Sequence, residues 1–160
     1  MAQAKVGNVR VRGLVSCAPS RVISNLDCPP EKRAERERLV RNIGILTRRV
    51  CAAGQVFSDL ALRAAEELIN GLNWSRDEID ALIVVTQSPD YPIPATAIIL
   101  QDRLGLPHTT LAFDVNLGCS GYPYGLYILS SMIARGGIRK GIVLIGDKSS
   151  NPESLDNGLL

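Results

Sequence analysis

The sequence predicts a layered α/β domain whose sheet is largely parallel. Strand-like and helix-like segments alternate along most of the chain, with glycine or proline at many of the boundaries. One strand candidate, Ala81–Thr86, is apolar on both alternating faces, and Leu111–Val115 is interpreted as another buried strand. Strands of that kind belong to sheets covered by helices on both sides. Alternation of such strands with helices is typical of α/β domains.

The first third of the chain carries two predicted strands and one charged helix. Lys5–Cys17 alternates loosely between apolar and polar residues and predicts a strand. Cys28–Pro30 stops the chain and begins a charged helix that runs to about Val40. Gly44 ends this region, and Thr47–Ala52 predicts a short second strand.

The rest of the chain alternates more regularly. The apolar spacing from Ser58 to about Gly71 predicts a helix, and Ser75–Glu78 matches a capping box. Further predicted elements are a helix over Ala95–Leu104, an uncharged helix after the turn at Gly118–Gly121, and a strand over Gly141–Gly146.

Composition limits the classes of function. The 160 residues fit one domain, and 46% hydrophobic with 21% charged residues is ordinary for a globular protein. The formal charge of +2 gives no support to nucleic-acid binding. The N-terminus lacks an apolar core of signal-peptide length, and the uncharged stretch Cys119–Ala134 falls short of the roughly 20 residues of a membrane span. We expect that stretch to be a buried helix in a cytoplasmic protein with no membrane or nucleic-acid partner.

The four cysteines are spaced too widely for a metal or redox pair. Cys17, Cys28, Cys51 and Cys119 include no C-x-x-C motif, so no metal site is predicted, and nothing indicates a secretory setting for disulfides. The first three lie at strand ends or in a proline-rich turn, where we expect a structural role.

Cys119 has a different setting, between a predicted buried strand and a predicted buried helix. A helix N-terminus carries partial positive charge and free N–H groups, which favour a thiolate. Gly118 and Gly121 would let the backbone turn sharply and a substrate carbonyl approach. The N–H of Cys119 would then help stabilise an oxyanion. The pattern favours a nucleophile over the alternative, a small cysteine packed at a strand–helix junction.

Other polar residues carry weaker signals. His108, the single histidine, follows Pro107 and is interpreted as an exposed loop residue. Cysteine–histidine catalysis would therefore have to use His108 or a base from elsewhere. Asp114, at a strand end, is interpreted as a structural hydrogen-bonding carboxylate. Neither G-x-x-x-x-G-K-[ST] nor G-x-G-x-x-G occurs, so nucleotide binding has no support.

Three segments resemble ketoacyl-ACP synthase III and its thiolase-fold relatives: Asp80–Ala95, Phe113–Tyr122 and Gly141–Asp147. The similarity runs from about Val6 to the end, and the segment around Cys119 is its most specific part. Within the family, Asn-Leu-Gly-Cys-Ser-Gly looks most like the synthase-III-like proteins encoded with surface-polysaccharide or secondary-metabolite genes. The resemblance implies the N-terminal half of a thiolase-like fold, with residues 1–160 as one domain and the C-terminal half absent from this chain.

The resemblance also implies a function. The cysteine that matches Cys119 attacks an acyl thioester, acyl-CoA or acyl-ACP, and becomes acylated. A malonyl group on acyl carrier protein then loses carbon dioxide, and its carbanion attacks the acyl-enzyme. No permanently bound cofactor or metal is implied. The residue that matches Ile93 lies on a loop that crosses a homodimer interface and lines the partner's acyl pocket.

The sequence departs from the family in two places. The family's catalytic histidine and asparagine lie in the second half, so this chain has the nucleophile without the groups that drive decarboxylation. The tryptophan and arginine that bind the CoA nucleotide in the family are replaced by Arg38 and Asn42, when the sequences are aligned on Gly44 and Ile45. An acyl-ACP or a longer acyl donor therefore stays open beside acetyl-CoA.

Two other functions compete with acyl transfer. The first is a non-catalytic fragment, or a binding or assembly subunit, of the same fold. The second is a cysteine hydrolase, because nucleophile elbows use similar strand–turn–helix corners. Leu117 stands where that elbow has its first glycine, and no histidine follows Cys119. These features count against the hydrolase.

Overall fold

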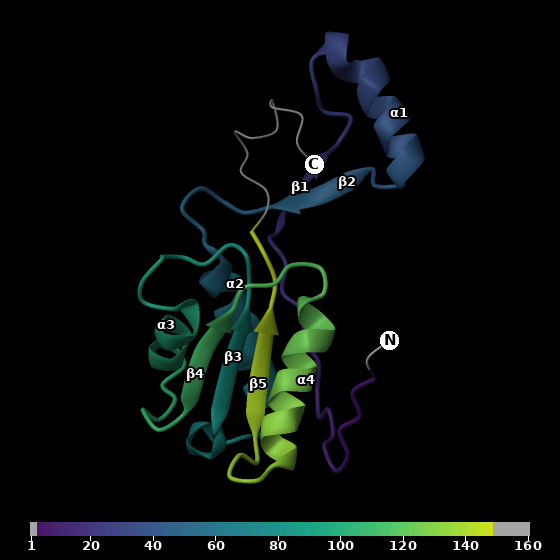
Figure 1. Ribbon diagram of the computed structural model, residues 1–160. Coiled ribbons are helices and arrows are strands. Elements are labelled where there is room, and N and C mark those ends of the chain that lie inside the picture. The colour runs from purple at the N-terminus through teal and green to yellow at the C-terminus, as the bar shows by residue number, and fades with distance from the viewer. Residues whose placement is uncertain (1–2, 149–160) are drawn as a thin grey trace. The chain divides into compact units, whose positions relative to one another are not determined.

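A computed structural model describes residues 3–148 (Figure 1). The described chain divides into two compact units. The larger unit comprises residues 3–17 and 56–148, and the smaller unit comprises residues 18–55. The larger unit contains a three-stranded sheet and the smaller unit a two-stranded one.

The sheet of the larger unit is parallel. Its strands are β3 (Ala81–Val85), β4 (Leu111–Val115) and β5 (Gly141–Ile145), and β3 lies in the centre, paired in parallel with both neighbours. Every residue of β3 is buried. The three predicted strands and the parallel sheet are confirmed. The predicted burial of Leu111–Val115 is wrong, because β4 has no buried residue and Leu111 is 50% exposed.

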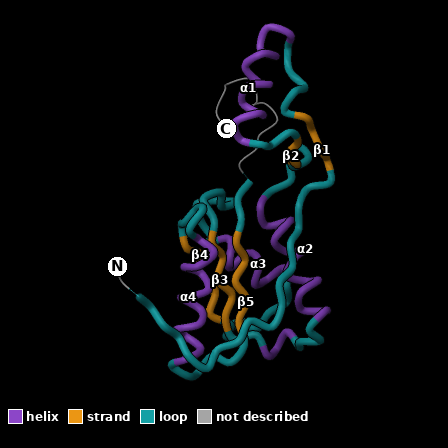
Figure 2. The backbone as a smooth tube through the Cα atoms, turned by 90° about the vertical axis from the view of Figure 1, so that its right-hand side faces the viewer, coloured by secondary structure: helices purple, strands orange, loops and turns teal. Residues whose placement is uncertain are grey.

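Helices cover both faces of this sheet. α2 (Phe57–Gly71) and α3 (Thr96–Arg103) lie on one face, and α4 (Gly121–Ala134) lies on the other, as Figure 2 shows. Alternate residues of β3 divide between the two layers of the core. Leu82 and Val84 belong to the cluster with α2 and α3, whereas Ile83 and Val85 belong to the cluster with Leu129 of α4.

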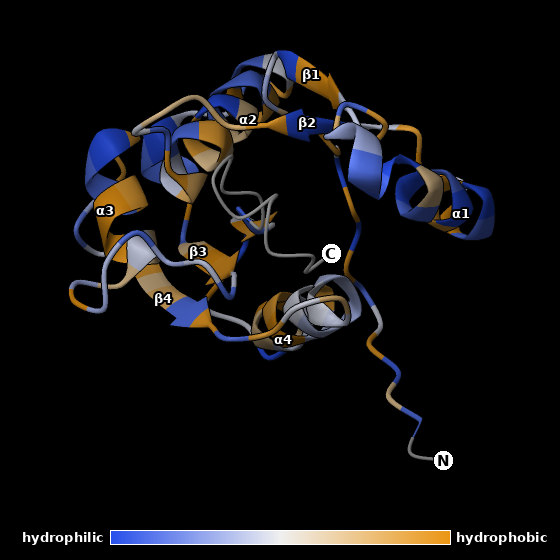
Figure 3. Cartoon of the chain, turned by 90° about the horizontal axis from the view of Figure 1, so that it is seen from above, coloured by the Kyte–Doolittle hydropathy of each residue, from blue (hydrophilic) through white to orange (hydrophobic). Residues whose placement is uncertain are grey.

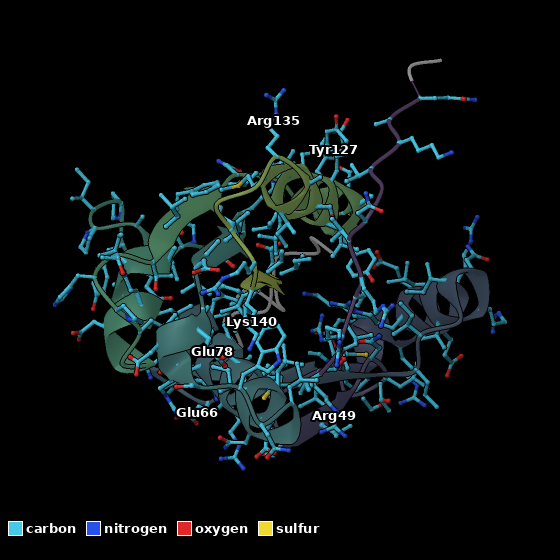
Figure 4. The ribbon with its side chains drawn as sticks, turned by 90° about the horizontal axis from the view of Figure 1, so that it is seen from below. Arg49, Glu66, Glu78, Tyr127, Arg135 and Lys140 are labelled. Atoms are coloured by element: carbon cyan, nitrogen blue, oxygen red, sulfur yellow. The ribbon has the colours of Figure 1, made fainter. Side chains whose placement is uncertain are left out.

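The amino-terminal end of the sheet is held by ionic contacts. Asp80 accepts hydrogen bonds from the backbone N–H groups of Arg139 (2.7 Å) and Lys140 (3.2 Å). Lys140 Nζ also donates to Glu78 of the 3₁₀ turn η2 (Arg76–Glu78) at 2.7 Å, and the two side chains are labelled in Figure 4. These contacts tie the start of β5 to the start of β3.

The smaller unit is a hairpin with one helix. β1 (Arg21–Ser24) pairs antiparallel with β2 (Thr47–Val50). Between them lie the 3₁₀ turn η1 (Pro30–Lys32) and α1 (Arg33–Ile43), which is largely hydrophilic in Figure 3. Gly44 ends α1 with a φ of 75°, in the left-handed region that glycine enters without strain. The second predicted strand and the stop at Gly44 are confirmed.

The predicted strand over Lys5–Cys17 is wrong. Described residues in this range form no strand, although Gly13 lies close to Leu68 of α2, where a Cβ on the glycine would be 2.8 Å from Leu68 Cδ1. A groove of about 960 Å³ is lined by residues 8–17, β5, α2 and α4. Among the described residues β5 pairs only with β3, so residues 5–17 make no strand pairing with its other edge.

The prediction of a buried uncharged helix is wrong for one side of α4. Gly121, Gly125 and Leu129 are buried, but three tyrosines on other sides of the helix are 47–55% exposed. These are Tyr122, Tyr124 and Tyr127. Within residues 3–148 α4 packs on the sheet through its buried side, and the side chains of these tyrosines stay exposed. No helix in this range is long and apolar enough to cross a membrane.

Close packing of α4 on the sheet predicts the effect of adding a side chain there. A Cβ on Gly125 would lie 2.8 Å from Val143 Cγ1 and 3.0 Å from Val85 Cγ2. Gly125→Leu should therefore lower the free energy of unfolding, measured with urea, by about 1–3 kcal/mol through overpacking. Gly71→Leu is the matched control, because nothing lies within 4 Å of that Cβ position. Equal losses in the two variants would contradict this account.

Candidate functional site

Cys119 lies in a turn between β4 and α4. The turn is closed by a hydrogen bond from the Gly121 N–H to the Gly118 carbonyl (2.7 Å), and α4 begins directly after it. Cys119 is exposed, whereas Cys51 is buried and Cys17 and Cys28 are intermediate. Within the described part of the chain, the N–H of Cys119 has no hydrogen-bond partner. An exposed thiol and a free N–H therefore share one residue at the start of a helix.

The two glycines of the turn serve close packing. A Cβ on Gly121 would lie 2.7 Å from Val85 Cγ1, and a Cβ on Gly118 would lie 2.5 Å from Gln87 Oε1. Neither glycine has a φ in the left-handed region, so the sharp turn predicted from sequence is not what requires them. The absence of side chains lets the turn sit on the carboxyl end of β3.

The segment after β3 is held by a carboxylate that follows β5. Asp147 Oδ1 accepts hydrogen bonds from Thr86 Oγ1 (3.0 Å), the Gln87 N–H (2.5 Å) and Ser88 Oγ (3.2 Å). Ser88 Oγ in turn accepts a bond from the Lys148 N–H (2.7 Å). This cluster and the Cys119 turn both follow the carboxyl ends of the strands, which is where open α/β sheets bind ligands.

Asp114 ties β4 to the start of α3. Its two carboxylate oxygens accept hydrogen bonds from the N–H groups of Thr96 and Ala97, each at 2.7 Å. These are orphan donors of the first helical turn, so Asp114 acts as a remote cap. The structure thus gives Asp114 the structural role expected from sequence.

The loop that carries Ile93 is held on both sides. Before it, Asp90 Oδ1 accepts a hydrogen bond from the Ser58 N–H (3.2 Å) in the first turn of α2. After it, the first turn of α3 is bound to Asp114. Ile93 itself is 87% exposed. A large apolar side chain is therefore presented to solvent from a loop with anchored ends.

A network between α2 and α3 supports the same loop. Arg103 donates to Ser58 Oγ (2.7 Å) and to Asp59 Oδ1 (2.9 Å). Asp59 Oδ2 accepts a hydrogen bond from the Val56 N–H (3.0 Å). The bond from Val56, reinforced by Arg103, holds the pKa of Asp59 below its ordinary value, against the opposing effect of burial.

Other sequence candidates lie away from Cys119 or in the smaller unit. His108 is exposed in the loop before β4, whereas Cys119 follows the end of β4, so one strand separates the two residues. Arg38 and Asn42 belong to α1 of the smaller unit. The described residues hold no group of three or more side chains suited to a metal ion.

Gln87 and Asp147 lie at this candidate site, and sequence reasoning did not single them out. Both follow strands that were predicted correctly, β3 and β5. The available signal was their position, because polar residues directly after parallel strands gather at the ligand-binding edge of a sheet. A hydrogen-bond network between segments 60 residues apart has no local pattern in the sequence.

Known proteins match the chain in sequence and in structure. A family profile for 3-oxoacyl-[acyl-carrier-protein (ACP)] synthase III matches residues 113–156. A beta-ketoacyl-[acyl-carrier-protein] synthase III of Streptomyces coelicolor is 38% identical over 92% of this chain and 45% of its own length. One of Alkalilimnicola ehrlichii is 37% identical over 84% of this chain and 42% of its own. This chain spans less than half the length of these relatives.

Solved structures show the same fold. A 3-oxoacyl-(acyl-carrier protein) synthase of Burkholderia xenovorans is 42% identical with a TM-score of 0.72, covering 78% of this chain and 36% of the other. A synthase III of Xanthomonas oryzae is 26% identical with a TM-score of 0.80, covering 88% and 44%. The fold is that of the thiolase-like condensing enzymes. Within that class, the chain belongs with the 3-oxoacyl-ACP synthase III-like proteins, as its sequence predicts.

The cap formed by Asp114 predicts a loss of stability on substitution. Asp114→Ala removes the acceptor of two helix N–H groups and should lower the free energy of unfolding by about 1–3 kcal/mol. Asp102→Ala, which removes an exposed carboxylate within α3, is the control and should stay within about 0.5 kcal/mol. Urea denaturation followed by circular dichroism measures both. A free energy of unfolding of Asp114→Ala equal to that of the wild type would show that the cap contributes nothing to stability.

The lowered pKa of Asp59 predicts a pH dependence of stability. Since the folded-state pKa lies below the ordinary value of 3.8, ionised Asp59 stabilises the folded chain above about pH 4. This contribution is lost as pH falls through the folded-state pKa. Urea unfolding at pH 6 and pH 3 should therefore show that acidification lowers the free energy of unfolding less in Asp59→Asn than in the wild type. An equal loss would contradict this role of Asp59.

Proposed function

We propose that this chain takes up an acyl group from a thioester on Cys119. One observation carries the proposal. Cys119 combines an exposed thiol, a free N–H and a position at the start of α4, beside the carboxyl ends of parallel strands. The helix N-terminus favours the thiolate, which is the nucleophilic form. The similarity to 3-oxoacyl-ACP synthase III gives the same reaction class.

The proposed step is a transthioesterification. The Cys119 thiolate attacks the thioester carbonyl carbon, and the resulting oxyanion accepts a hydrogen bond from the Cys119 N–H. The tetrahedral species then collapses, the carbon–sulfur bond to the donor breaks, and the donor thiol leaves as a thiolate that takes a proton from water. Acyl-CoA and acyl-ACP both fit this chemistry as donors. No bound cofactor or metal takes part in the step.

Condensation with malonyl-ACP requires more polypeptide than residues 1–160. In the proposed second step the malonyl thioester loses carbon dioxide, and its carbanion attacks the acyl carbonyl and releases Cys119. This chain spans 42–45% of the two relatives described above, and we propose that it corresponds to their first half. Support comes from the groove beside β5 and from the exposed tyrosines of α4, which are surfaces that a second half would cover.

The Ile93 loop supports a homodimer. An apolar side chain that is 87% exposed on a loop with anchored ends is suited to burial by another subunit. We propose that Ile93 enters the partner's acyl pocket and does not take part in the chemistry. The expected setting is the cytoplasm, with acyl carrier protein as a partner.

The same exposed surfaces favour a second candidate function. A non-catalytic fragment, or a subunit that binds or assembles through the groove and α4, would need these surfaces but not a reactive Cys119. Labelling of the cysteines distinguishes the two candidates.

Selective acylation tests the proposal. The chain is incubated with acetyl and octanoyl thioesters of CoA and of N-acetylcysteamine, and peptide mass spectrometry then locates the acyl groups. We expect Cys119 to be acylated before Cys17, Cys28 and Cys51, because it alone is exposed and at a helix N-terminus. Cerulenin, which is bound in a solved structure of OleA from Xanthomonas campestris, should label the same cysteine.

Two variants sharpen the labelling experiment. Cys119→Ala should abolish acylation, whereas Cys28→Ala, which removes a partly exposed thiol of the smaller unit, should leave it unchanged. Equal labelling of all four thiols, or none at Cys119, would overturn the proposal and favour the non-catalytic function. Release of free acid with turnover would favour a hydrolase.

A further inference from the structure

Gln87 is the side chain that packs against the turn containing Cys119. Its Oε1 lies 2.5 Å, and its Nε2 3.8 Å, from the position that a Cβ would take on Gly118. The carboxamide therefore occupies the space that the missing side chain of Gly118 leaves, one residue from the thiol. The oxygen is the end nearer the turn, and the NH₂ group is farther from it.

The backbone of Gln87 is fixed while its carboxamide stays unused. The Gln87 N–H donates to Asp147, and both neighbouring side chains, Thr86 and Ser88, donate to the same carboxylate. Within residues 3–148 the carboxamide itself has no hydrogen-bond partner, and Gln87 is exposed. A rigid backbone thus presents a free donor and acceptor beside an exposed thiol, which is the arrangement of a pre-organised binding group.

We propose that the Gln87 carboxamide binds the arm of the acyl thioester beside Cys119. The inference rests on the proposed acyl transfer. A neutral carboxamide both donates and accepts hydrogen bonds, so its best complement is another amide. The substrate class is therefore a thioester whose thiol arm carries an amide near the sulfur. Gln87 makes this contact before and during the attack, so its loss weakens binding and leaves the saturated acylation rate near the wild-type value.

Two thioesters that differ in one amide test the inference. Octanoyl-N-acetylcysteamine carries an amide in its thiol arm, and the octanoyl thioester of ethanethiol does not. For the first, Gln87→Ala should raise the concentration that half-saturates Cys119 acylation about three- to tenfold, the effect of losing one neutral hydrogen bond. For the second, the variant should match the wild type. Gln3→Ala, at another exposed glutamine of the larger unit, is the control and should match the wild type with both thioesters.

Gly118 provides an independent variant. Gly118→Ala should displace the carboxamide, because the added Cβ would meet Gln87 Oε1 and the glycine has no left-handed φ. With octanoyl-N-acetylcysteamine, Gly118→Ala should raise the concentration that half-saturates Cys119 acylation in the wild-type background. In the Gln87→Ala background it should raise that concentration little further. Additive effects would show that Gly118 acts on the turn without involving Gln87, and would count against the inference.

The outcomes separate this inference from the acyl transfer on which it rests. Equal changes with both thioesters, or no change with either, would overturn the role of Gln87 and leave acylation of Cys119 standing. Methyl methanethiosulfonate, a small thiol reagent without an amide, should modify Cys119 at the same rate in Gln87→Ala and wild type. A slower rate would mean that Gln87 acts on the thiol, and would also overturn the inference. Failure of both thioesters to acylate wild-type Cys119 would overturn the acyl transfer itself.

Discussion

The methyl groups of Val85, at the end of β3, lie against the first turn of α4, and the absence of side chains at Gly121 and Gly125 allows this approach. Two glycines four residues apart share one face of a helix, so the whole first turn is drawn onto the sheet. Cys119 precedes that turn. The position of Cys119 therefore depends on how closely α4 can lie on β3. The position of β3 is fixed in turn because the strand is buried on both faces.

Two carboxylates extend this rigidity to the loops around the turn. Asp114 lies near the end of β4 and holds the start of α3, while Asp147 follows β5 and holds the segment after β3. Each satisfies backbone N–H groups that would otherwise lack a partner. The Cys119 turn, Gln87 and the Ile93 loop are thus fixed from three adjacent strands of one sheet. A site assembled in this way needs little reorganisation when a substrate binds.

The sequence predicted the parts of this arrangement that depend on local pattern. Apolar periodicity located β3, β4 and β5, and the glycine spacing around Cys119 marked a strand–helix corner. The contacts of Asp147 and Gln87 were not predicted, because they join segments far apart in the chain. The structure adds a reason for Gly118 that the sequence did not give, which is close packing against Gln87, because a glycine needed for packing has no distinct local pattern.

The wrong prediction for Lys5–Cys17 shows that a strand-like pattern does not form a strand when no neighbouring strand pairs with it. Alternating apolar residues favour a strand, but a strand forms only where it is hydrogen-bonded to a neighbour. Within the described chain this segment and β5 line the same groove without pairing. The exposed side of α4 has the same origin, since an uncharged helix is suited to burial on both sides. The Cys119 turn needs neither surface, because its supports come from β3, β4 and β5. We therefore infer that the proposed acylation of Cys119 is separable from the proposed condensation, because the described contacts that hold the Cys119 turn all lie within the larger unit.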